Sequence, residues 1–166
     1  MILYKIPEVK AFMARLLMGT AFDALLLKEM ELATFTTFTV SGQFNEEFFS
    51  RDELEQRNGI KAVFWSEVRP IAYNMIKGNK TPLSFKLVFQ LPPQQCQNLL
   101  DRIGGKMKLE ELGGLYLNIR FEKGELSIIT GTAIKTFSLD KSLEHEWDAY
   151  AGRMLKELGI AYEQIS

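Results

Sequence analysis

The chain has 166 residues, a length that fits one domain and can bury about 70% of the surface of the unfolded chain. Hydrophobic residues make up 46% and charged residues 25%, values close to the globular average that exclude a disordered or fibrous protein. The formal net charge of -1 excludes a broad positive field for holding nucleic acid, so such binding would need a local patch.

The counts of cysteine and histidine limit the metal and redox chemistry of the chain. Cys96 is the one cysteine and His145 the one histidine, which excludes an internal disulfide and the usual zinc ligand sets. His145-Glu146 resembles the start of a metalloprotease helix, but Ala149 occupies the place of the second histidine. We therefore expect no metal and no cofactor, and we expect a solvent-facing helix surface formed by Glu144, His145, Glu146 and Asp148.

The N-terminal segment 1–27 is apolar enough to suggest a signal peptide. Four charged residues interrupt it, namely Glu8, Lys10, Arg15 and Asp23. No stretch of the chain approaches the roughly 18 uninterrupted apolar residues of a spanning helix. The sequence therefore predicts a cytoplasmic protein that does not enter a membrane.

The first half of the chain alternates strands and helices. Residues 2–6 are expected to form a short strand, and a helix follows over residues 7–18 with a proline at its start. Residues 34–40 have the β-branched and aromatic content of a strand. Residues 50–59 have the capping-box spacing of a short helix, and residues 66–77 are predicted to form a longer one.

The second half begins with the clearest strand pattern, residues 83–91, in which apolar and polar residues alternate. A helix is predicted to follow over residues 92–103. The Lys123-Gly124 turn indicates a hairpin, and further elements are expected as strands 115–122, 125–130 and 133–139 and as a last helix ending at Gly159.

The order of these elements suggests an internal repeat in an α+β fold. Units 1–49 and 83–139 each begin with a strand, a proline, a helix and a glycine, and residues 50–78 would be a helical insertion. Two such βαβββ units would give antiparallel sheets with helices packed on one face, an architecture similar to one domain of a DNA sliding clamp. The alternative is that the order strand, proline, helix, glycine is common in proteins and does not indicate a repeat. The helix over 93–103 carries too few cations for DNA.

Residues 77–81, Lys-Gly-Asn-Lys-Thr, invite interpretation as a phosphate-binding loop. The upstream glycine is missing, and the flanking elements run from helix to strand, opposite to the order that such a loop requires. The remaining hypothesis is a local basic cluster of Lys77, Lys80 and Arg69 that could hold an anion. We take as candidate ligand-binding residues Arg69, Lys77, Lys80, Thr81 and Arg120.

No complete catalytic motif is present. The chain has no Gly-x-Ser-x-Gly sequence, and Cys96 is expected to be a buried residue within a helix, with no base placed beside it. Arg120 could instead pair across strands with Glu122 or Glu125 at a solvent face. The sequence therefore favours a protein that is not an enzyme, without excluding one.

Several runs of residues resemble an uncharacterised family of Gram-positive anaerobic bacteria. The resemblance spans nearly the whole chain and is carried by residues 66–70, 76–78, 80–86, 114–120, 130–132 and 135–143. That family is a domain of unknown function. The resemblance therefore implies a self-standing bacterial domain and supplies no activity, substrate or catalytic residue.

Two hypotheses about function follow. The first is a non-enzymatic binding or protein-interaction module, clamp-like in its sharper form, with a protein partner or a second copy held by an apolar surface. The alternative is a small-molecule or phosphate-ligand binder, or an enzyme, that uses Arg69, Lys77 and Lys80 around an anion. These hypotheses differ in whether the basic side chains converge on one pocket.

Overall fold

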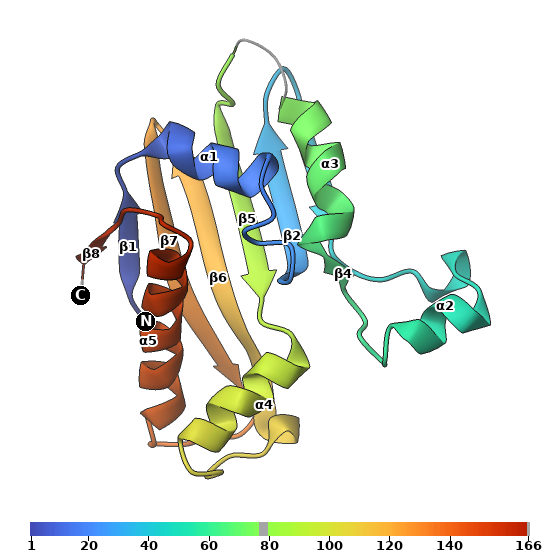
Figure 1. Cartoon of the computed structure of the whole chain (residues 1–166), viewed down its shortest axis with the longest axis vertical. Coiled ribbons are helices and arrows are strands. Elements are labelled where there is room, and N and C mark those ends of the chain that lie inside the picture. Colours follow the sequence, from blue (N-terminus) through green and yellow to red (C-terminus); the bar gives the residue numbers. More distant parts are fainter. Residues whose placement is uncertain (77–79, 166) are drawn as a thin grey trace.

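The computed structural model describes residues 1–76 and 80–165. It has an α+β fold built on one eight-stranded antiparallel sheet (Figure 1). The strands are β1 (Leu3–Ile6), β2 (Leu26–Ala33), β3 (Thr37–Ser41), β4 (Val63–Phe64), β5 (Ser84–Gln90), β6 (Leu112–Glu122), β7 (Glu125–Ile134) and β8 (Glu163–Ile165). The α-helices are α1 (Val9–Leu17), α2 (Arg51–Gln56), α3 (Trp65–Ile76), α4 (Pro93–Arg102) and α5 (Ser142–Glu157).

The strands lie in the order β3-β2-β5-β6-β7-β1-β8, and β4 pairs with the start of β2. Strands β5, β6 and β7 form the centre of the sheet, with β6 and β7 joined by the predicted Lys123-Gly124 turn. Lys123 and Gly124 both have positive φ, as the hairpin requires. The sheet is open, so β3 and β8 are its two edges.

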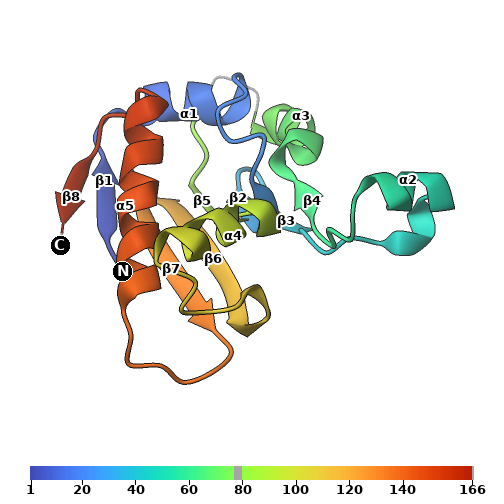
Figure 2. The same ribbon diagram turned by 60° about the horizontal axis from the view of Figure 1, so that its bottom comes forward.

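Helices α1, α3, α4 and α5 all cover one face of the sheet (Figures 1 and 2). The core lies between these two layers, with Trp65 of α3, Trp147 of α5 and Phe89 of β5 fully buried. The prediction of antiparallel strands with helices on one face is thus confirmed, although they form one sheet. Within the described ranges no helix is both long and apolar enough to cross a membrane.

The predicted internal repeat is not confirmed. In the second unit β5 lies beside β6, whereas in the first unit β1 lies beside β7, on the far side of the sheet from β2. The two units therefore occupy unequal places in the sheet. The clamp-like architecture depended on their equivalence and loses that support.

The third strand predicted over residues 133–139 is wrong. Strand β7 continues through Gly131 to Ile134 because β6 begins at Leu112 and supplies pairing partners along its whole length. Gly131 lies opposite Tyr116 within the ladder and does not interrupt it. Residues 135–141 form a loop that leads to α5.

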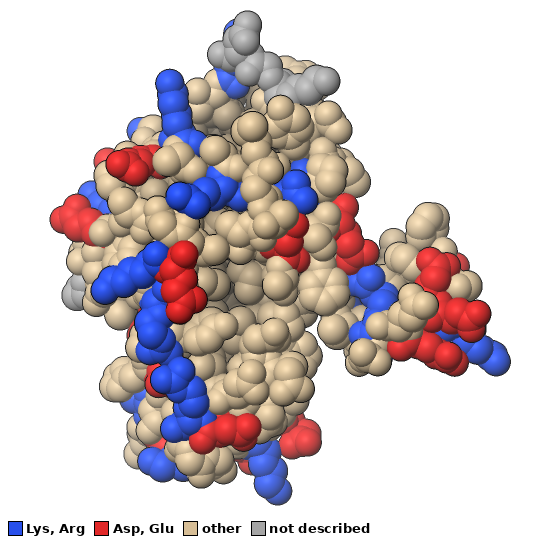
Figure 3. Space-filling view, in the orientation of Figure 1, with Lys and Arg blue, Asp and Glu red and all other residues tan. Residues whose placement is uncertain are grey.

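Residues 43–62, which we call the arm, project from the β3 side of the molecule (Figures 1 and 2). A bridge between Gln43 and Ala62 closes the base of the arm. The predicted capping box of α2 is confirmed, because Ser50 Oγ accepts from Glu53 N–H and the Glu53 carboxylate accepts from Ser50 N–H. Exposed acidic side chains gather on the arm (Figure 3), which makes it unsuited to nucleic acid.

Candidate functional site

An apolar hollow of about 490 Å³ lies between α1, α3 and the turn from β6 to β7, and we call it the α1–α3 cavity. Helix α1 forms one wall, Tyr73 and Ile76 of α3 form another, and Phe121 and Gly124 come from β6 and its turn. The segment before β5 completes the cavity with Lys80, Thr81 and Pro82. A volume of this size suits a small organic molecule.

Helix α1 lines the cavity because its apolar stripe is wider than the sheet can cover. Phe12 and Leu16 point into the core and are fully buried. The adjacent face of the helix lines the cavity. Its residues, spaced three or four apart, are Val9, Lys10, Met13, Ala14, Leu17 and Met18. One helix therefore contributes both to the core and to an open apolar wall.

Among the described residues of the lining, two lysines carry a charge. Lys10 comes from α1 and Lys80 from the segment before β5, and neither takes part in an ion pair within the described part of the chain. The described lining contains no Asp, Glu, His or Cys side chain. The arrangement can hold an apolar body beside a negative charge, but it offers no carboxylate or imidazole for general acid–base catalysis.

The structure brings only some of the candidate ligand-binding residues together. Lys80 and Thr81 line the α1–α3 cavity, while Lys77 lies outside the described residues. Arg69 lies elsewhere on α3 and donates two hydrogen bonds to Asp23, at 2.8 and 3.1 Å. This bidentate ion pair occupies the guanidinium that the sequence assigned to an anion.

Arg120 is also separate from the cavity. It lies in β6 opposite Lys86 of β5 and Ser127 of β7, and its side chain is exposed. Its neighbours in the strand, Ile119 and Phe121, are buried against the helices, so alternation puts Arg120 on the face without helices. Lys10 lines the cavity but was not among the candidate residues. In the sequence its position on the helix cannot be distinguished from that of an ordinary solvent-exposed lysine.

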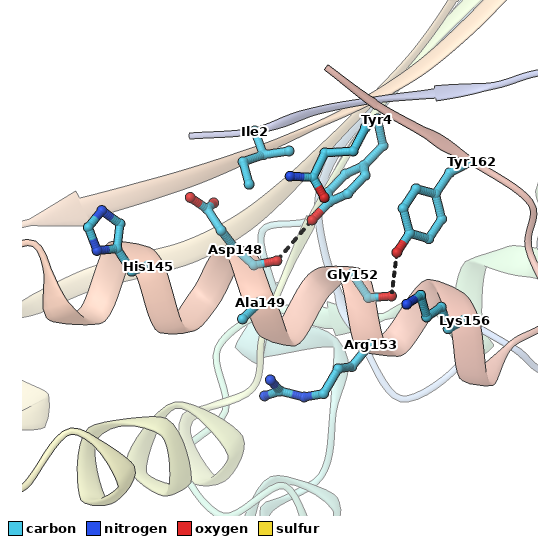
Figure 4. Close-up of a pocket in the computed structure, with 10 residues that line it drawn as sticks. Ile2, Tyr4, His145, Asp148, Ala149, Gly152, Arg153, Lys156 and Tyr162 are labelled. Carbon is cyan, nitrogen blue, oxygen red and sulfur yellow. Dashed lines mark hydrogen bonds between the residues drawn. The ribbon is translucent and has the colours of Figure 1, made fainter. Parts of the chain in front are cut away.

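A second hollow, of about 480 Å³, lies between α5 and the strands β1 and β8 (Figure 4). Two tyrosine hydroxyl groups lie on its inner wall: Tyr4 Oη donates to the backbone oxygen of Asp148 at 2.9 Å, and Tyr162 Oη donates to that of Gly152 at 3.5 Å. Burial raises the pKa of Tyr4, and Tyr162 and Asp148 add to the effect. His145 and Lys156 lie at the rim.

Asp148 corrects the expectation of a solvent-facing acidic surface on the last helix, because it is only 7% exposed. Its carboxylate accepts hydrogen bonds from Thr130 Oγ1 and from the Met1 amino group, the latter at 3.0 Å. Thr130 Oγ1 in turn accepts from Ile2 N–H at 2.9 Å. These bonds tie β1, β7 and α5 together, so the polar atoms behind the second hollow are engaged within the fold.

Cys96 is buried in α4, as expected, and its thiol donates to the backbone oxygen of Leu91 at 3.4 Å. Burial raises the pKa of this thiol to about 11, so it is almost entirely protonated at neutral pH and is a poor nucleophile. Among the described residues, no three His, Cys, Asp or Glu side chains come close enough to hold a metal ion.

Comparison with protein families gives a match over residues 15–163, which includes only the last three residues of α1 but every other element that lines the α1–α3 cavity. The chain belongs to the family of unknown function DUF5721. The match confirms the resemblance to an uncharacterised family. No curated protein and no solved structure is significantly similar to this DUF5721 chain.

Proposed function

We propose that this protein is a non-enzymatic binding protein whose α1–α3 cavity holds a small amphipathic anion. The observation that carries the proposal is the combination of apolar walls with two lysines, Lys10 and Lys80, that reach the same hollow from different elements. An apolar lining with a few placed polar groups is typical of small-molecule sites. This proposal keeps Lys80 and Thr81 from the anion hypothesis and leaves out Arg69.

The chemistry of the ligand follows from the lining. Val9, Met13 and Leu17 present an aliphatic wall, which favours a hydrocarbon body over a sugar or a nucleotide base. Lys10 and Lys80 are point charges with rotatable donors, so they suit a carboxylate or phosphate head group without demanding a planar one. The ligand class is therefore an alkyl chain with one anionic head.

Calorimetric titration with straight-chain carboxylates and phosphates of increasing length tests this proposal. We expect binding that strengthens with chain length, because each added methylene buries more apolar surface, worth about 0.8 kcal/mol when fully buried. The uncharged alcohols of the same lengths should bind more weakly. No binding by any member of the series at millimolar concentration would refute the proposed function.

Matched variants locate the site. Ala14→Trp should fill the cavity and weaken binding at least about tenfold, which corresponds to about 1.4 kcal/mol. Ala11→Trp is the control, because Ala11 is also exposed on α1 but is not part of the lining. Replacing Lys10 and Lys80 together by glutamine should weaken binding of the anions but not of the alcohols, whereas Lys5→Gln should change neither.

A further inference from the structure

Strand β3 leaves a row of backbone groups unpaired at the edge of the sheet. The N–H of Gly42 donates to the backbone oxygen of Lys28 in β2 at 2.8 Å. Because backbone groups of alternate residues in an antiparallel strand point to the same side, those of Thr37, Thr39 and Ser41 face away from β2. In the described part of the chain no strand covers that side of β3.

The sequence of this edge lacks the charged residues and the proline that commonly protect an edge strand from pairing. Residues 34–42, Thr-Phe-Thr-Thr-Phe-Thr-Val-Ser-Gly, contain no charge and no proline. Edge strands of monomeric proteins are usually blunted by lysine, proline, a bulge or a covering loop. The opposite edge strand, β8, has only three residues and carries Glu163.

We propose that two copies of this chain pair through β3, antiparallel and across a twofold axis at Thr39, so that their sheets become continuous. In this register Thr39 faces Thr39 of the second copy, and Thr37 faces Ser41 of the second copy. Each of these facing pairs has outward-pointing backbone groups and can exchange two hydrogen bonds. The proposal goes beyond ligand binding and does not depend on the α1–α3 cavity.

The side chains of β3 are compatible with their own twofold image. Phe38 and Val40 lie opposite Leu32 and Met30 of β2, which are buried on the side of the helices. In the twofold register Phe38 faces Val40 of the second copy, so two half-buried apolar side chains meet and extend the core layer. No like charges face each other, which favours a second copy as the occupant.

The arm lies at the same side of the molecule and strengthens the argument for a second copy. It begins two residues after Ser41 and projects beyond β3 (Figure 2). The twofold register sets Ser41 beside Thr37 of the second copy, so each arm would run toward Phe35 of the other. Phe48 of the arm is 84% exposed and Phe35 is 90% exposed, and this contact would cover both.

Disulfide trapping tests the pairing and its register. Facing residues with outward backbone groups have Cα atoms about 5.5 Å apart, within the range of a disulfide. Thr39→Cys should therefore form a linked dimer under mild oxidation. Thr37→Cys alone should not, since its counterpart would lie about 13 Å away along the strand, but a mixture with Ser41→Cys should link. The native Cys96 is buried and does not compete.

Sedimentation velocity gives the independent measurement. The native protein should sediment as a dimer, and Thr39→Lys should shift it to the monomer because two like charges would face each other at the axis. Gln164→Lys and Gln164→Cys, at the β8 edge, are the controls and should neither dissociate nor link the protein. A monomeric native protein, a dimer that persists in Thr39→Lys, or equal linking by Thr37→Cys alone would overturn the proposal.

Discussion

At the scale of single residues, Gly42 joins the sheet to the arm. Its N–H donates to Lys28 O, and its own backbone oxygen accepts from Val63 N–H, so β2, β3 and β4 meet there. A Cβ atom at this position would overlap the backbone oxygen of Leu27. Because the obstacle is backbone of β2 that is paired on both sides, with β4 and with β5, it cannot move aside.

Gly42→Ala should therefore lower the free energy of unfolding by at least about 3 kcal/mol, the upper end of the range for overpacking. Gly131→Ala is the matched control, since its added Cβ would meet the end of the Asn118 side chain at 3.2 Å and Tyr116 Cβ at an ordinary contact distance of 3.7 Å, with no backbone atom in the way. Urea denaturation of both variants measures the difference. Equal effects of the two substitutions would contradict the role of Gly42.

Arg57 anchors the arm to the body of the protein. Its guanidinium donates to both carboxylate oxygens of Glu67 at 3.1 Å and to Ala62 O at 2.9 Å. It also lies 4.1 Å from the centre of the Phe44 ring. Burial opposes ionisation of Glu67, but hydrogen bonds from Arg57 and from the backbone N–H of Phe64 outweigh it and hold the pKa of Glu67 below its ordinary value of 4.5.

A lowered pKa makes the anchor dependent on pH. The Arg57–Glu67 pair stabilises the folded protein fully at a pH above 4.5, the ordinary pKa of a glutamate. This stabilisation is lost as the pH falls through the lower pKa that Glu67 has in the folded protein. Hydrogen exchange in residues 43–62, corrected for the intrinsic rate, should therefore speed up on acidification. Glu67→Gln should show the faster exchange already at neutral pH.

Glu53 must be separated from this effect, because hydrogen bonds with Ser50 also lower its pKa. Glu53→Gln keeps the capping box while removing its titration, so it is the appropriate background for the experiment. If acid-dependent exchange of the arm disappears in Glu53→Gln, the capping box and not the Arg57–Glu67 pair controls the arm.

At the scale of elements, the sequence was sufficient to predict those helices and turns whose structure is determined by residues close together in the chain. Helix α2 followed from the Ser50–Glu53 capping box, and the β6–β7 hairpin followed from Lys123-Gly124. The break predicted at Gly131 failed because the ladder with β6 outweighs the low strand propensity of glycine. The pairing of β4 with β2 could not be predicted from a two-residue strand.

The candidate site could be predicted only in part, because contacts between elements that are distant in the chain form it. Lys80 and Thr81 stood out as polar residues after a helix, and they line the α1–α3 cavity. The stripe containing Val9 and Met13 was consistent with a fully covered core face. Only the packing of α1 against α3 and the β6–β7 turn leaves part of that stripe open.

At the scale of the whole molecule, the position of β1 could not be predicted. Strands β1 and β7 pair although more than a hundred residues separate them in the chain, and no local pattern encodes such a partner. Ile6 faces Leu126 and Tyr4 faces Ile128, and all four are buried, so the matching of buried side chains in the completed sheet fixes the register. This placement leaves β3 as an edge and gives the two sequence units unequal positions.

The most direct test of the proposed function is the NMR spectrum of protein labelled with ¹³C at the methionine methyl groups, recorded during titration with an alkyl carboxylate. Met13 and Met18 line the α1–α3 cavity, whereas Met107 and Met154 lie elsewhere and serve as internal controls. We predict that the Met13 and Met18 signals shift with one common affinity while those of Met107 and Met154 stay in place. Shifts confined to the Met107 or Met154 signals, or no shift at millimolar concentrations of the carboxylate, would contradict ligand binding in the α1–α3 cavity.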